Sequence, residues 1–454
     1  MKERQHNNIS ILVPVSEKTQ VPPLGYESIK GVLSQAFPDM NVDPVYIDNP
    51  SSLERADILI ANFYSTLGFI DLFRTLRNSG YSLDKKQNPF ITIAGGTGAY
   101  NPLPVKDTVD YVTFTEGDLV GLLSQKTGVE ARAWSPPNPV WARTDYITSI
   151  MPTESCKYKC TFCQLRLQND GRVKNYDLEE IRRIIAREEP RRILVHSASI
   201  LQYEYLDELV DVLDKSEAEI YLGSMNLIDI DQKRSDDLFK LKPRHTIGAE
   251  KDTDVQLYFG LETGSARVLS EMRKPLTRKA AVEKVDILKA SGFRNLGFYL
   301  ILGYPNTATE DSVETIDLVN SIADTVGDDG KISIKCTPFI PHLGTGVSHE
   351  PARYWADCVQ ELNLLRRSVR PNIGFDISDP LYYLTSIVLI RGNREHASLL
   401  QHIVRQRDFD IKDDNTMDSL LAKLELPSLE AHLKGKAPLD LSRSRRKVFD
   451  TNEI

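Results

Sequence analysis

Residues 146–164, YITSIMPTESCKYKCTFCQ, decide the fold, because a short apolar run leads there into three closely spaced cysteines. Residues 146–151 are predicted to form a buried strand. Cys156, Cys160 and Cys163 follow on the loop that leaves this strand. Thiolates are soft ligands for iron or zinc, and this spacing lets three sulfurs converge on one point. The pattern predicts a metal centre with three protein ligands and one position open to a substrate.

The cysteine loop also has a purely structural interpretation, in which it holds a zinc ion. His196 and His245 are candidates for the fourth ligand in that case, since no further cysteine is near. The chain has five cysteines in all, and the remaining two are Cys336 and Cys358. An odd and sparse set of this kind does not predict a disulfide framework, and it favours a reducing compartment.

Composition narrows the class of protein. A chain of 454 residues is long enough for two to four domains. It carries 56 Lys and Arg against 64 Asp and Glu, a net charge of −8, which disfavours nucleic acid and anionic membranes as partners. The start of the chain is polar, and the apolar runs are too short to span a bilayer. We therefore expect a cytoplasmic protein with no membrane segment.

Strand and helix patterns alternate through residues 145–348, and the cysteine loop follows the first strand. The six strand–helix units predict a partial (β/α)6 barrel, short of the eight units of a full barrel. Helices are predicted between the strands by apolar positions at helical spacing. The predicted strands are residues 146–151, 192–196, 220–225, 256–261, 295–302 and 331–338.

Residues 1–130 show the same alternation and are predicted to form a doubly wound, Rossmann-like parallel sheet. Short polar or glycine-rich loops follow its strands, so the loops gather at one edge. The chain contains no GxGxxG pattern, so a dinucleotide site is not supported. A proline-rich linker, residues 131–144, comes next. Residues 349–454 are predicted to form a separate, mostly helical C-terminal domain, ending in a basic run that we interpret as a solvated tail.

The CxxxCxxC spacing, with Phe162 before the last cysteine, resembles the signature of the radical S-adenosylmethionine (SAM) superfamily. The resemblance implies that Cys156, Cys160 and Cys163 hold a [4Fe–4S] cluster whose fourth iron is chelated by SAM. An electron from the cluster then breaks a carbon–sulfur bond and yields a 5′-deoxyadenosyl radical, which abstracts a hydrogen atom. It also implies an electron donor such as flavodoxin or ferredoxin.

Further positions follow from the same resemblance. Ser199 ends the second strand, where the family contacts the SAM amino group, although the usual Gly-Gly-Glu is missing. Glu262 ends the fourth strand and corresponds to a polar contact to SAM. Its alternative role is a carboxylate at a helix start. Residues 297–303 resemble the element that packs on adenine.

The N-terminal region narrows the resemblance to the subfamily with a cobalamin-binding domain. Residues 22–26 (PPLGY), 95–102 (GGTGAYNP) and 115–118 (TEGD) carry it. It implies a cobalamin site and, most commonly, methylation of an unactivated carbon. The DxHxxG element is absent, and the alternative is a domain that kept its fold without the cofactor. The positions implied are Gly95, Gly96, Thr97, Gly98, Glu116 and Gly117.

Other reactions stay open, namely rearrangement, ring contraction or sulfur insertion, as does a zinc-stabilised binding protein without turnover. A second cluster of the methylthiotransferase kind is excluded, because no cysteine precedes Cys156. Cys336 lies near the end of the sixth strand and is a candidate catalytic hydrogen donor, with a buried core thiol as the alternative. The acidic balance favours a small-molecule or peptide substrate.

Overall fold

The computed structural model describes residues 8–13, 24–49, 51–63, 65–165, 172–245, 255–371, 373–405, 411–444 and 448–454. The chain forms two compact units. The described residues up to 137, together with residues 380–454, make up the first, and residues 138–379 make up the second. We call them the N-terminal unit and the barrel unit. In the described part of the chain, no helix has the length and apolar character that crossing a membrane requires.

The N-terminal unit is built on a six-stranded sheet with the order β17-β5-β4-β3-β1-β2. Its strands are parallel except β17, so the predicted doubly wound sheet is confirmed. The strands are β1 (Asn8–Val13), β2 (Asn41–Tyr46), β3 (Ile58–Asn62), β4 (Ile91–Gly95), β5 (Tyr111–Thr113) and β17 (Val448–Asp450), and the helices between them are α1 (Leu24–Ala36), α2 (Gly68–Asn78) and α3 (Glu116–Thr127).

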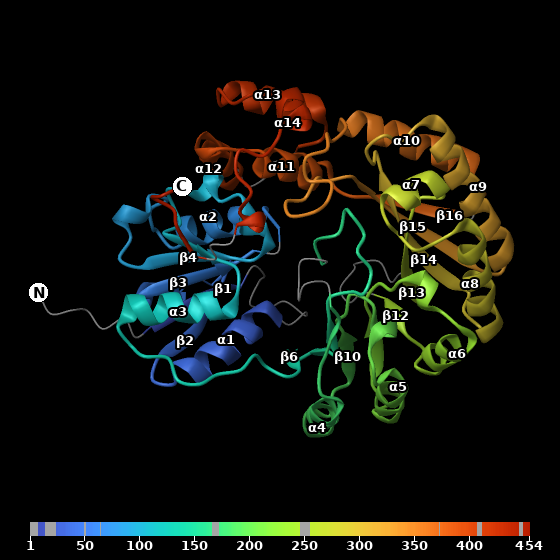
Figure 1. Ribbon diagram of the computed structural model, residues 1–454, viewed down its shortest axis with the longest axis horizontal. Coiled ribbons are helices and arrows are strands. Elements are labelled where there is room, and N and C mark those ends of the chain that lie inside the picture. Colours follow the sequence, from blue (N-terminus) through green and yellow to red (C-terminus); the bar gives the residue numbers. More distant parts are fainter. Residues whose placement is uncertain are drawn as a thin grey trace, which may run out of the picture. The chain divides into compact units, whose positions relative to one another are not determined.

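The C-terminal region is mostly helical, as predicted, but it is not a separate domain. From residue 380 onward it belongs to the N-terminal unit. Strand β17 adds to the sheet of that unit by pairing antiparallel with β5. Figure 1 shows the red helix α12 beside the blue helix α2. The basic run lies largely outside the described residues. The helices are α11 (Pro380–Ile390), α12 (Ala397–Arg405), α13 (Asp414–Lys423) and α14 (Leu429–Lys434).

Asn101 explains part of this attachment. Its side chain is fully buried, and its Nδ2 donates to the carbonyls of Leu389, Ile390 and Gly392 at 3.3, 3.0 and 2.8 Å. These carbonyls stand at the end of α11, where a helix leaves its last acceptors unpaired. A residue of the GGTGAYNP motif therefore caps a helix that lies almost 300 positions further along the chain.

Replacing Asn101 by alanine is expected to destabilise the N-terminal unit by about 2–3 kcal/mol, because buried carbonyls lose their donor. Urea unfolding followed by circular dichroism measures this change. Asn41→Ala is the matched control, since Asn41 is exposed and its side chain donates to Asn8 on the neighbouring strand. Equal midpoints for the two variants would contradict the capping role.

A buried histidine pair lies in the same C-terminal region. His396 and His432 are both buried, with their Nε2 atoms 2.7 Å apart. Nδ1 of His432 lies 2.8 Å from the Ser428 carbonyl, which only a protonated Nδ1 can satisfy. His432 therefore accepts at Nε2 when neutral, and His396 donates. Burial lowers the pKa of His396 to about 4, and it also lowers the pKa of His432.

The pair is expected to make the stability of the N-terminal unit fall with acid. Both imidazoles are held neutral in the folded state, so their stabilisation is complete above the ordinary pKa of 6.5 and is lost as pH falls toward 4. His396→Gln should flatten this slope in urea midpoints measured between pH 7 and pH 4.5. Burial raises the pKa of Asp71 to about 6. Asp71 titrates in the unaltered protein and in the variant alike, so its contribution cancels when the two stability profiles are subtracted. Parallel profiles would refute the prediction.

The barrel unit contains the six predicted strands, now β7 (Thr148–Met151), β10 (Arg192–Val195), β11 (Glu219–Leu222), β13 (Leu257–Glu262), β14 (Asn295–Leu302) and β15 (Lys331–Pro338). They form two sheets, β12-β11-β10-β7-β6 and β13-β14-β15-β16, joined by a bridge between Met225 and Phe259. The helices are α4 (Leu178–Glu188), α5 (Leu206–Lys215), α6 (Gln232–Lys240), α7 (Ala266–Glu271), α8 (Arg278–Ser291), α9 (Thr309–Val326) and α10 (Trp355–Ser368).

Three further strands border these sheets. β6 (Val140–Arg143) pairs antiparallel with β7, so the predicted linker ends in a strand of the barrel unit. β12 (Arg244–His245) pairs with β11, and β16 (Ile373–Ile377) pairs parallel with β15 beyond the predicted barrel boundary at residue 348. A small ladder, β8 (Thr153–Glu154) with β9 (Lys174–Asn175), flanks the cysteine loop.

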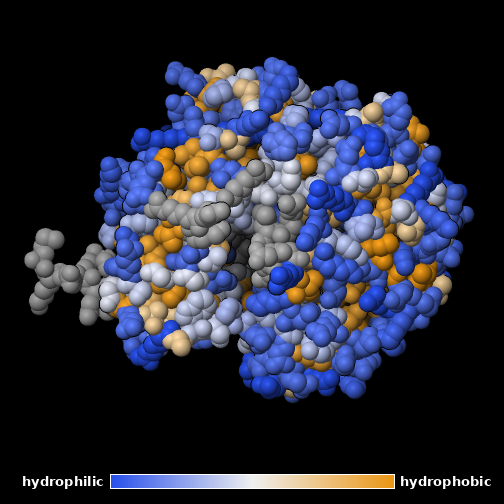
Figure 2. All heavy atoms as spheres, viewed as in Figure 1, coloured by the Kyte–Doolittle hydropathy of each residue, from blue (hydrophilic) through white to orange (hydrophobic). Residues whose placement is uncertain are grey.

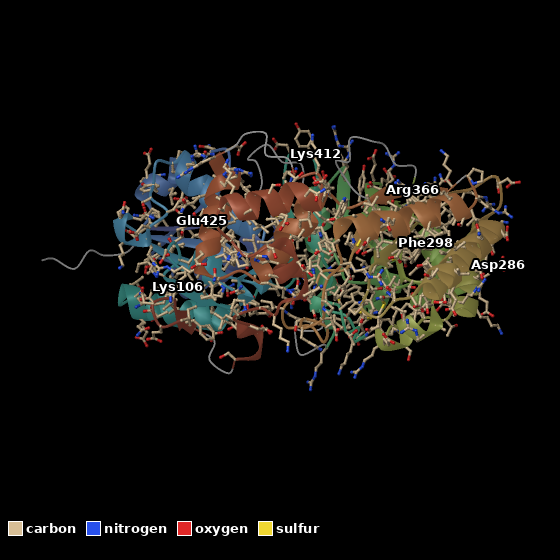
Figure 3. The ribbon with its side chains drawn as sticks, turned by 90° about the horizontal axis from the view of Figure 1, so that it is seen from above. Lys106, Asp286, Phe298, Arg366, Lys412 and Glu425 are labelled. Carbon is tan, nitrogen blue, oxygen red and sulfur yellow. The ribbon has the colours of Figure 1, made fainter. Side chains whose placement is uncertain are left out.

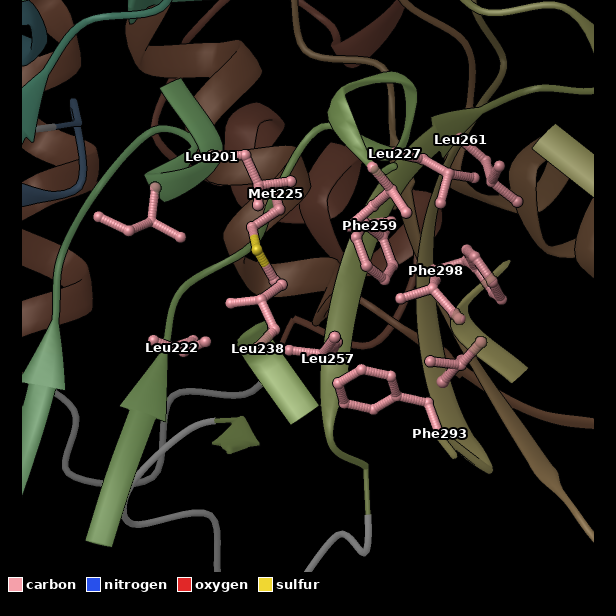
Figure 4. Close-up of a cluster of buried hydrophobic side chains, with 14 of the residues drawn as sticks. Leu201, Leu222, Met225, Leu227, Leu238, Leu257, Phe259, Leu261, Phe293 and Phe298 are labelled. Carbon is pink, nitrogen blue, oxygen red and sulfur yellow. The ribbon is translucent and has the colours of Figure 1, made fainter. Parts of the chain in front are cut away.

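The core of the barrel unit lies between the strands and their covering helices. Leu257, Phe259 and Leu261 alternate along β13 and face this core with Phe298 of β14 and Leu238 of α6 (Figure 4). Figure 3 shows Phe298 inside the unit, whereas the exposed Asp286 and Arg366 lie on the outer helices. Polar side chains cover the outer surface over α4 and α5 (Figure 2). Alternation thus leaves the opposite face of each strand for the barrel interior.

Candidate cofactor site at the cysteine loop

The cysteine loop leaves the carboxyl end of β7 and is tied down at Thr161. The Thr161 amide donates to the Met272 carbonyl at 2.9 Å, and its own carbonyl accepts from the Gly346 amide at 2.8 Å. Its hydroxyl lies 3.0 Å from that of Tyr304. The Cys163 amide closes a turn on the Cys160 carbonyl at 3.2 Å. Segments from three parts of the barrel unit therefore fix the turn that carries two of the three cysteines.

Cys156 is surrounded by amide donors. Asn226 Nδ2 and Gln202 Nε2 lie 3.5 and 3.6 Å from its sulfur. Gln202 also donates to Asp229 at 2.9 Å, and it accepts from the Lys157 amide at 2.9 Å. The Lys157 ammonium pairs with the buried Asp229 at 2.7 Å. N–H groups directed at a sulfur stabilise its thiolate form and tune an attached iron–sulfur cluster.

A buried ion pair lies next to this loop. Lys274 Nζ is 2.9 Å from Glu262 Oε1, and both side chains are almost completely buried. The same ammonium reaches Asn226 Oδ1 at 3.5 Å. Burial lowers the pKa of Lys274, but Glu262 and the thiols of Cys160 and Cys156 outweigh it, so the pKa is raised overall. Lys274 is therefore held as a cation beside the cysteines.

The backbone at Glu262 is unusual. Its φ is 68°, in the left-handed region, and β13 has a register irregularity between Gly260 and Glu262. A Cβ at Gly260 would lie 2.3 Å from Glu262 Oε1 and 2.9 Å from Lys274 Nζ. Strained backbone of this kind persists where the surroundings enforce it, often at functional sites. Glycine at position 260 is what leaves room for the ion pair.

Burial favours the protonated form of two of the three thiols. Burial raises the pKa of Cys160 to about 12 and also raises the pKa of Cys163. Buried thiolates need a compensating positive charge, and a bound metal provides it while displacing the proton. Three loop thiols, two amide donors at Cys156 and the cationic Lys274 are therefore a donor set that fits an iron–sulfur cluster.

The predicted convergence of the sulfurs on one point is not found. Within the ranges that the structure describes, no three His, Cys, Asp or Glu side chains are arranged to hold a single ion. A cubane cluster binds each cysteine through a different iron, so its ligands need not meet at one point. The side chain of His245 lies outside the described residues, and His196 Nε2 is buried with no partner among the described groups.

Ser199 lies next to this site but has a structural partner. It is buried, and its hydroxyl accepts from the backbone amide of Asn226 at 3.3 Å. This hydrogen bond helps to hold the Asn226 side chain against Cys156. Sequence reasoning missed Asn226, Gln202 and Lys274. Asn226 directly follows the predicted strand 220–225, and that position was the available signal.

Cys336 does not face the barrel interior. Its side chain is buried in the core with Ile332 and Ile334 from the same strand face and Cys358 and Leu362 from α10. Burial raises its pKa to about 12. The predicted hydrogen-donor role is therefore corrected to that of a core thiol. The alternation along β15 was predicted, but the face toward the interior carries Ser333, Lys335 and Thr337.

The loop after β14 links α10 to the cysteine turn. Glu361 of α10 accepts from the Gly303 amide at 3.0 Å, and Arg353 donates to the Thr307 carbonyl at 2.8 Å. Gly303 has φ 65°, which suits the tight turn. Between these two anchors, Tyr304 packs on Phe339 and reaches Thr161. The helix therefore supports the cysteine turn through Tyr304.

Tyr304→Phe is expected to weaken retention of iron by about fivefold, because one hydrogen bond of roughly 1 kcal/mol to the cysteine turn is lost. Iron released to a chelator from the reconstituted protein measures this effect. Tyr146→Phe, at an exposed tyrosine of the same unit, is the control. Identical release from both variants would show that Tyr304 does not position the turn.

The predicted N-terminal positions lie at one edge of their sheet. Gly95 pairs with Thr113 of β5, and Glu116 and Gly117 begin α3. Gly96 has φ 82°, and a Cβ there would lie 2.4 Å from the Phe63 carbonyl oxygen. A Cβ at Gly98 would lie 2.3 Å from the Ser65 carbonyl oxygen. Both glycines are therefore required by the neighbouring loop, whereas Gly117 borders open space. Thr97 begins a single helical turn at the same edge.

The comparisons with known proteins agree with this geometry. Residues 150–319 match the family model described as the Radical SAM superfamily. An uncharacterized methyltransferase of Pyrococcus horikoshii is 25% identical over 38% of this chain and 36% of its own length. The chain thus spans about a third of that relative. An uncharacterized protein of Methanocaldococcus jannaschii is 19% identical over 92% of this chain and 96% of its own.

One solved structure has a similar fold over most of the chain. It is the cobalamin-dependent radical SAM enzyme OxsB with aqua-cobalamin bound, with a TM-score of 0.51 and 12% identity, covering 95% of this chain and 77% of that one. An identity this low establishes likeness of fold alone. Residues 150–319 therefore match the radical SAM superfamily, and the fold of the chain is similar to that of a cobalamin-dependent radical SAM enzyme.

Proposed function

We propose that Cys156, Cys160 and Cys163 hold a [4Fe–4S] cluster and that the protein uses it with SAM to begin a radical reaction. The single observation that carries the proposal is the anchored cysteine loop, with two amide donors at Cys156. When bound, the cluster and SAM supply a carbon radical able to abstract hydrogen from an unactivated carbon. The protein's part is to hold the loop, exclude water and position the substrate.

Glu262 and Ser199 are proposed to contact SAM. Lys274 engages Oε1 of Glu262, and Oε2 has no hydrogen bond in the described part of the chain, so it can accept one from an amine or hydroxyl of SAM. The Ser199 hydroxyl would contact SAM while it accepts from the backbone amide of Asn226. The strained φ of Glu262 fixes the direction of its carboxylate.

We further propose cobalamin-dependent methylation of an unactivated carbon in a small molecule or peptide. The similarity to OxsB and the name of the Pyrococcus relative support this choice. Gly95, Gly96, Thr97, Gly98, Glu116 and Gly117 would border the cobalamin at the carboxyl edge of the N-terminal sheet. A small reductant protein such as flavodoxin or ferredoxin would supply electrons.

Anaerobic reconstitution with iron, sulfide and hydroxocobalamin tests these proposals. We expect iron–sulfur absorption, a corrinoid band and 5′-deoxyadenosine upon reduction with SAM. A cluster without corrinoid would favour a rearrangement, ring contraction or sulfur insertion. Stoichiometric zinc with no cluster would refute the radical assignment.

The cobalamin edge can be tested separately at Gly117. A Cβ there meets only Thr115 Oγ1 at 3.9 Å, so Gly117→Trp should fold normally and lower corrinoid occupancy. Gly121→Trp is the matched control, because Gly121 is exposed on the same helix with nothing within 4 Å of a Cβ. Equal corrinoid occupancy in both variants would place the cofactor elsewhere.

A further inference from the structure

The interior face of the second barrel sheet is polar and partly open. On β13, β14 and β15 the core-facing side chains are buried, whereas most of those on the opposite face are partly exposed. A full barrel fills its interior with side chains. On the interior face of β13–β16, which we call the wall, Tyr299 and Lys335 are partly exposed and Asp376 is exposed, so a ligand can contact them.

Strand register arranges that wall in rows. Tyr258, Gly297, Ser333 and Gly374 are consecutive partners across the four strands. Gly260, Tyr299, Lys335 and Asp376 form the next row toward the carboxyl ends, in the direction of Glu262. The second row therefore combines an aromatic ring and two opposite charges one layer away from the candidate cofactor site.

Two tyrosines belong to the wall, of which Tyr258 is fully buried and Tyr299 is partly exposed. Tyr258 and Tyr299 have ring centroids 5.2 Å apart at an interplanar angle of 43°. Tyr258 fits because Gly297 has no side chain, since a Cβ there would lie 2.4 Å from its ring. Its hydroxyl donates to Ser333 Oγ at 3.0 Å. Burial raises the pKa of Tyr299 to about 12, and Tyr258 and Glu262 add to this.

Lys335 and Asp376 are opposite charges that do not pair with each other. The Lys335 ammonium lies over the Tyr258 ring, 4.7 Å from its centroid, and makes no ion pair within the described ranges. Asp376 is exposed, and its Oδ1 accepts from the Ile377 amide at 2.9 Å. Partnered strands place the two residues side by side, roughly 4.8 Å apart along the hydrogen-bonding direction.

We propose that this wall binds the substrate and that the substrate is an amino-acid-type zwitterion. Its carboxylate would pair with Lys335, its ammonium with Asp376, and its apolar part would lie on the partly exposed Tyr299. A ligand with both charges satisfies two neighbouring groups that make no ion pair within the described residues, whereas an anion alone would be repelled by Asp376. The reaction of the bound substrate rests on the proposed radical function, whereas the binding of the zwitterion does not.

The test is calorimetric titration of the full-length protein with three probes, L-phenylalanine, 3-phenylpropionate and 2-phenylethylamine. We expect L-phenylalanine to bind about tenfold more tightly than either singly charged probe, as charge-assisted hydrogen bonds at both ends require. Lys335→Gln should weaken L-phenylalanine about tenfold and leave 2-phenylethylamine unchanged. Asp376→Asn should weaken L-phenylalanine and spare 3-phenylpropionate.

Lys331→Gln is the control, because Lys331 is exposed at the start of the same strand. Equal affinity for all three probes, no binding of L-phenylalanine, or equal losses in Lys331→Gln and Lys335→Gln would overturn the proposal. Titrations are made before and after cluster reconstitution. Failure to form a cluster would then refute the proposed function while the pattern of probe binding still decides the zwitterion site.

Discussion

Replacing Cys160 by alanine is expected to abolish 5′-deoxyadenosine formation and to remove most of the iron from the reconstituted protein. A cluster held by three cysteines loses one iron–protein bond when any of them is removed. The N-terminal unit should remain folded, because the cysteine loop belongs to the barrel unit. Product analysis under anaerobic, reducing conditions and colourimetric iron determination measure the two effects.

Cys358→Ala provides the control for this experiment. Cys358 is a fully buried core thiol of α10, so its loss creates a small cavity and costs about 1–2 kcal/mol of stability without touching the cluster. Iron content and 5′-deoxyadenosine should stay near those of the unaltered protein. Undiminished 5′-deoxyadenosine from Cys160→Ala would refute the assignment of Cys160 as a ligand.

Removing one member of the Glu262–Lys274 pair is expected to have the largest effect on stability. Lys274→Met leaves a buried carboxylate without its cation, which costs about 3–5 kcal/mol. Glu262→Gln leaves the ammonium without its anion, and we expect a loss of similar size. Urea unfolding of the protein without cofactors measures both.

The double variant Lys274→Met with Glu262→Gln separates pairing from simple loss of packing. Because it buries no unpaired charge, it should be more stable than either single variant. Lys279→Met is the surface control: Lys279 is 86% exposed and lies 3.7 Å from Glu283, so its loss should change stability by less than about 0.5 kcal/mol. Additive losses in the double variant would show that the two charges are not coupled.

Much of the fold could be predicted because its strands are short apolar runs bounded by polar turns. All six predicted strands of the barrel unit are present, and the cysteine loop follows the first of them. The attachment of residues 380–454 to the N-terminal unit could not be predicted. It depends on single long-range contacts, such as Asn101 with the end of α11 and β17 with β5, and these leave no local pattern.

The site was predictable only where chemistry is concentrated in one stretch. Cys156, Cys160 and Cys163 are adjacent in sequence, whereas Lys274 gains its role from a bulged strand that brings Glu262 to it. For Cys336 the sequence predicted the strand correctly, but not which face of that strand lines the barrel interior. Alternation placed it correctly with Ile332 and Ile334, but the apolar character of that set assigns it to the core, and the polar Lys335 marks the interior.

The return of the chain to its first sheet has a consequence for the order of synthesis. During translation β1 to β5 leave the ribosome first, but the strand that covers the edge of β5 is residues 448–450. The barrel unit, residues 138–379, is made and can fold in between. The unit that emerges first is therefore the last to be completed. A fragment ending near residue 137 would leave the edge of β5 unpaired, which promotes aggregation. Residues 138–379 are therefore the fragment to express alone.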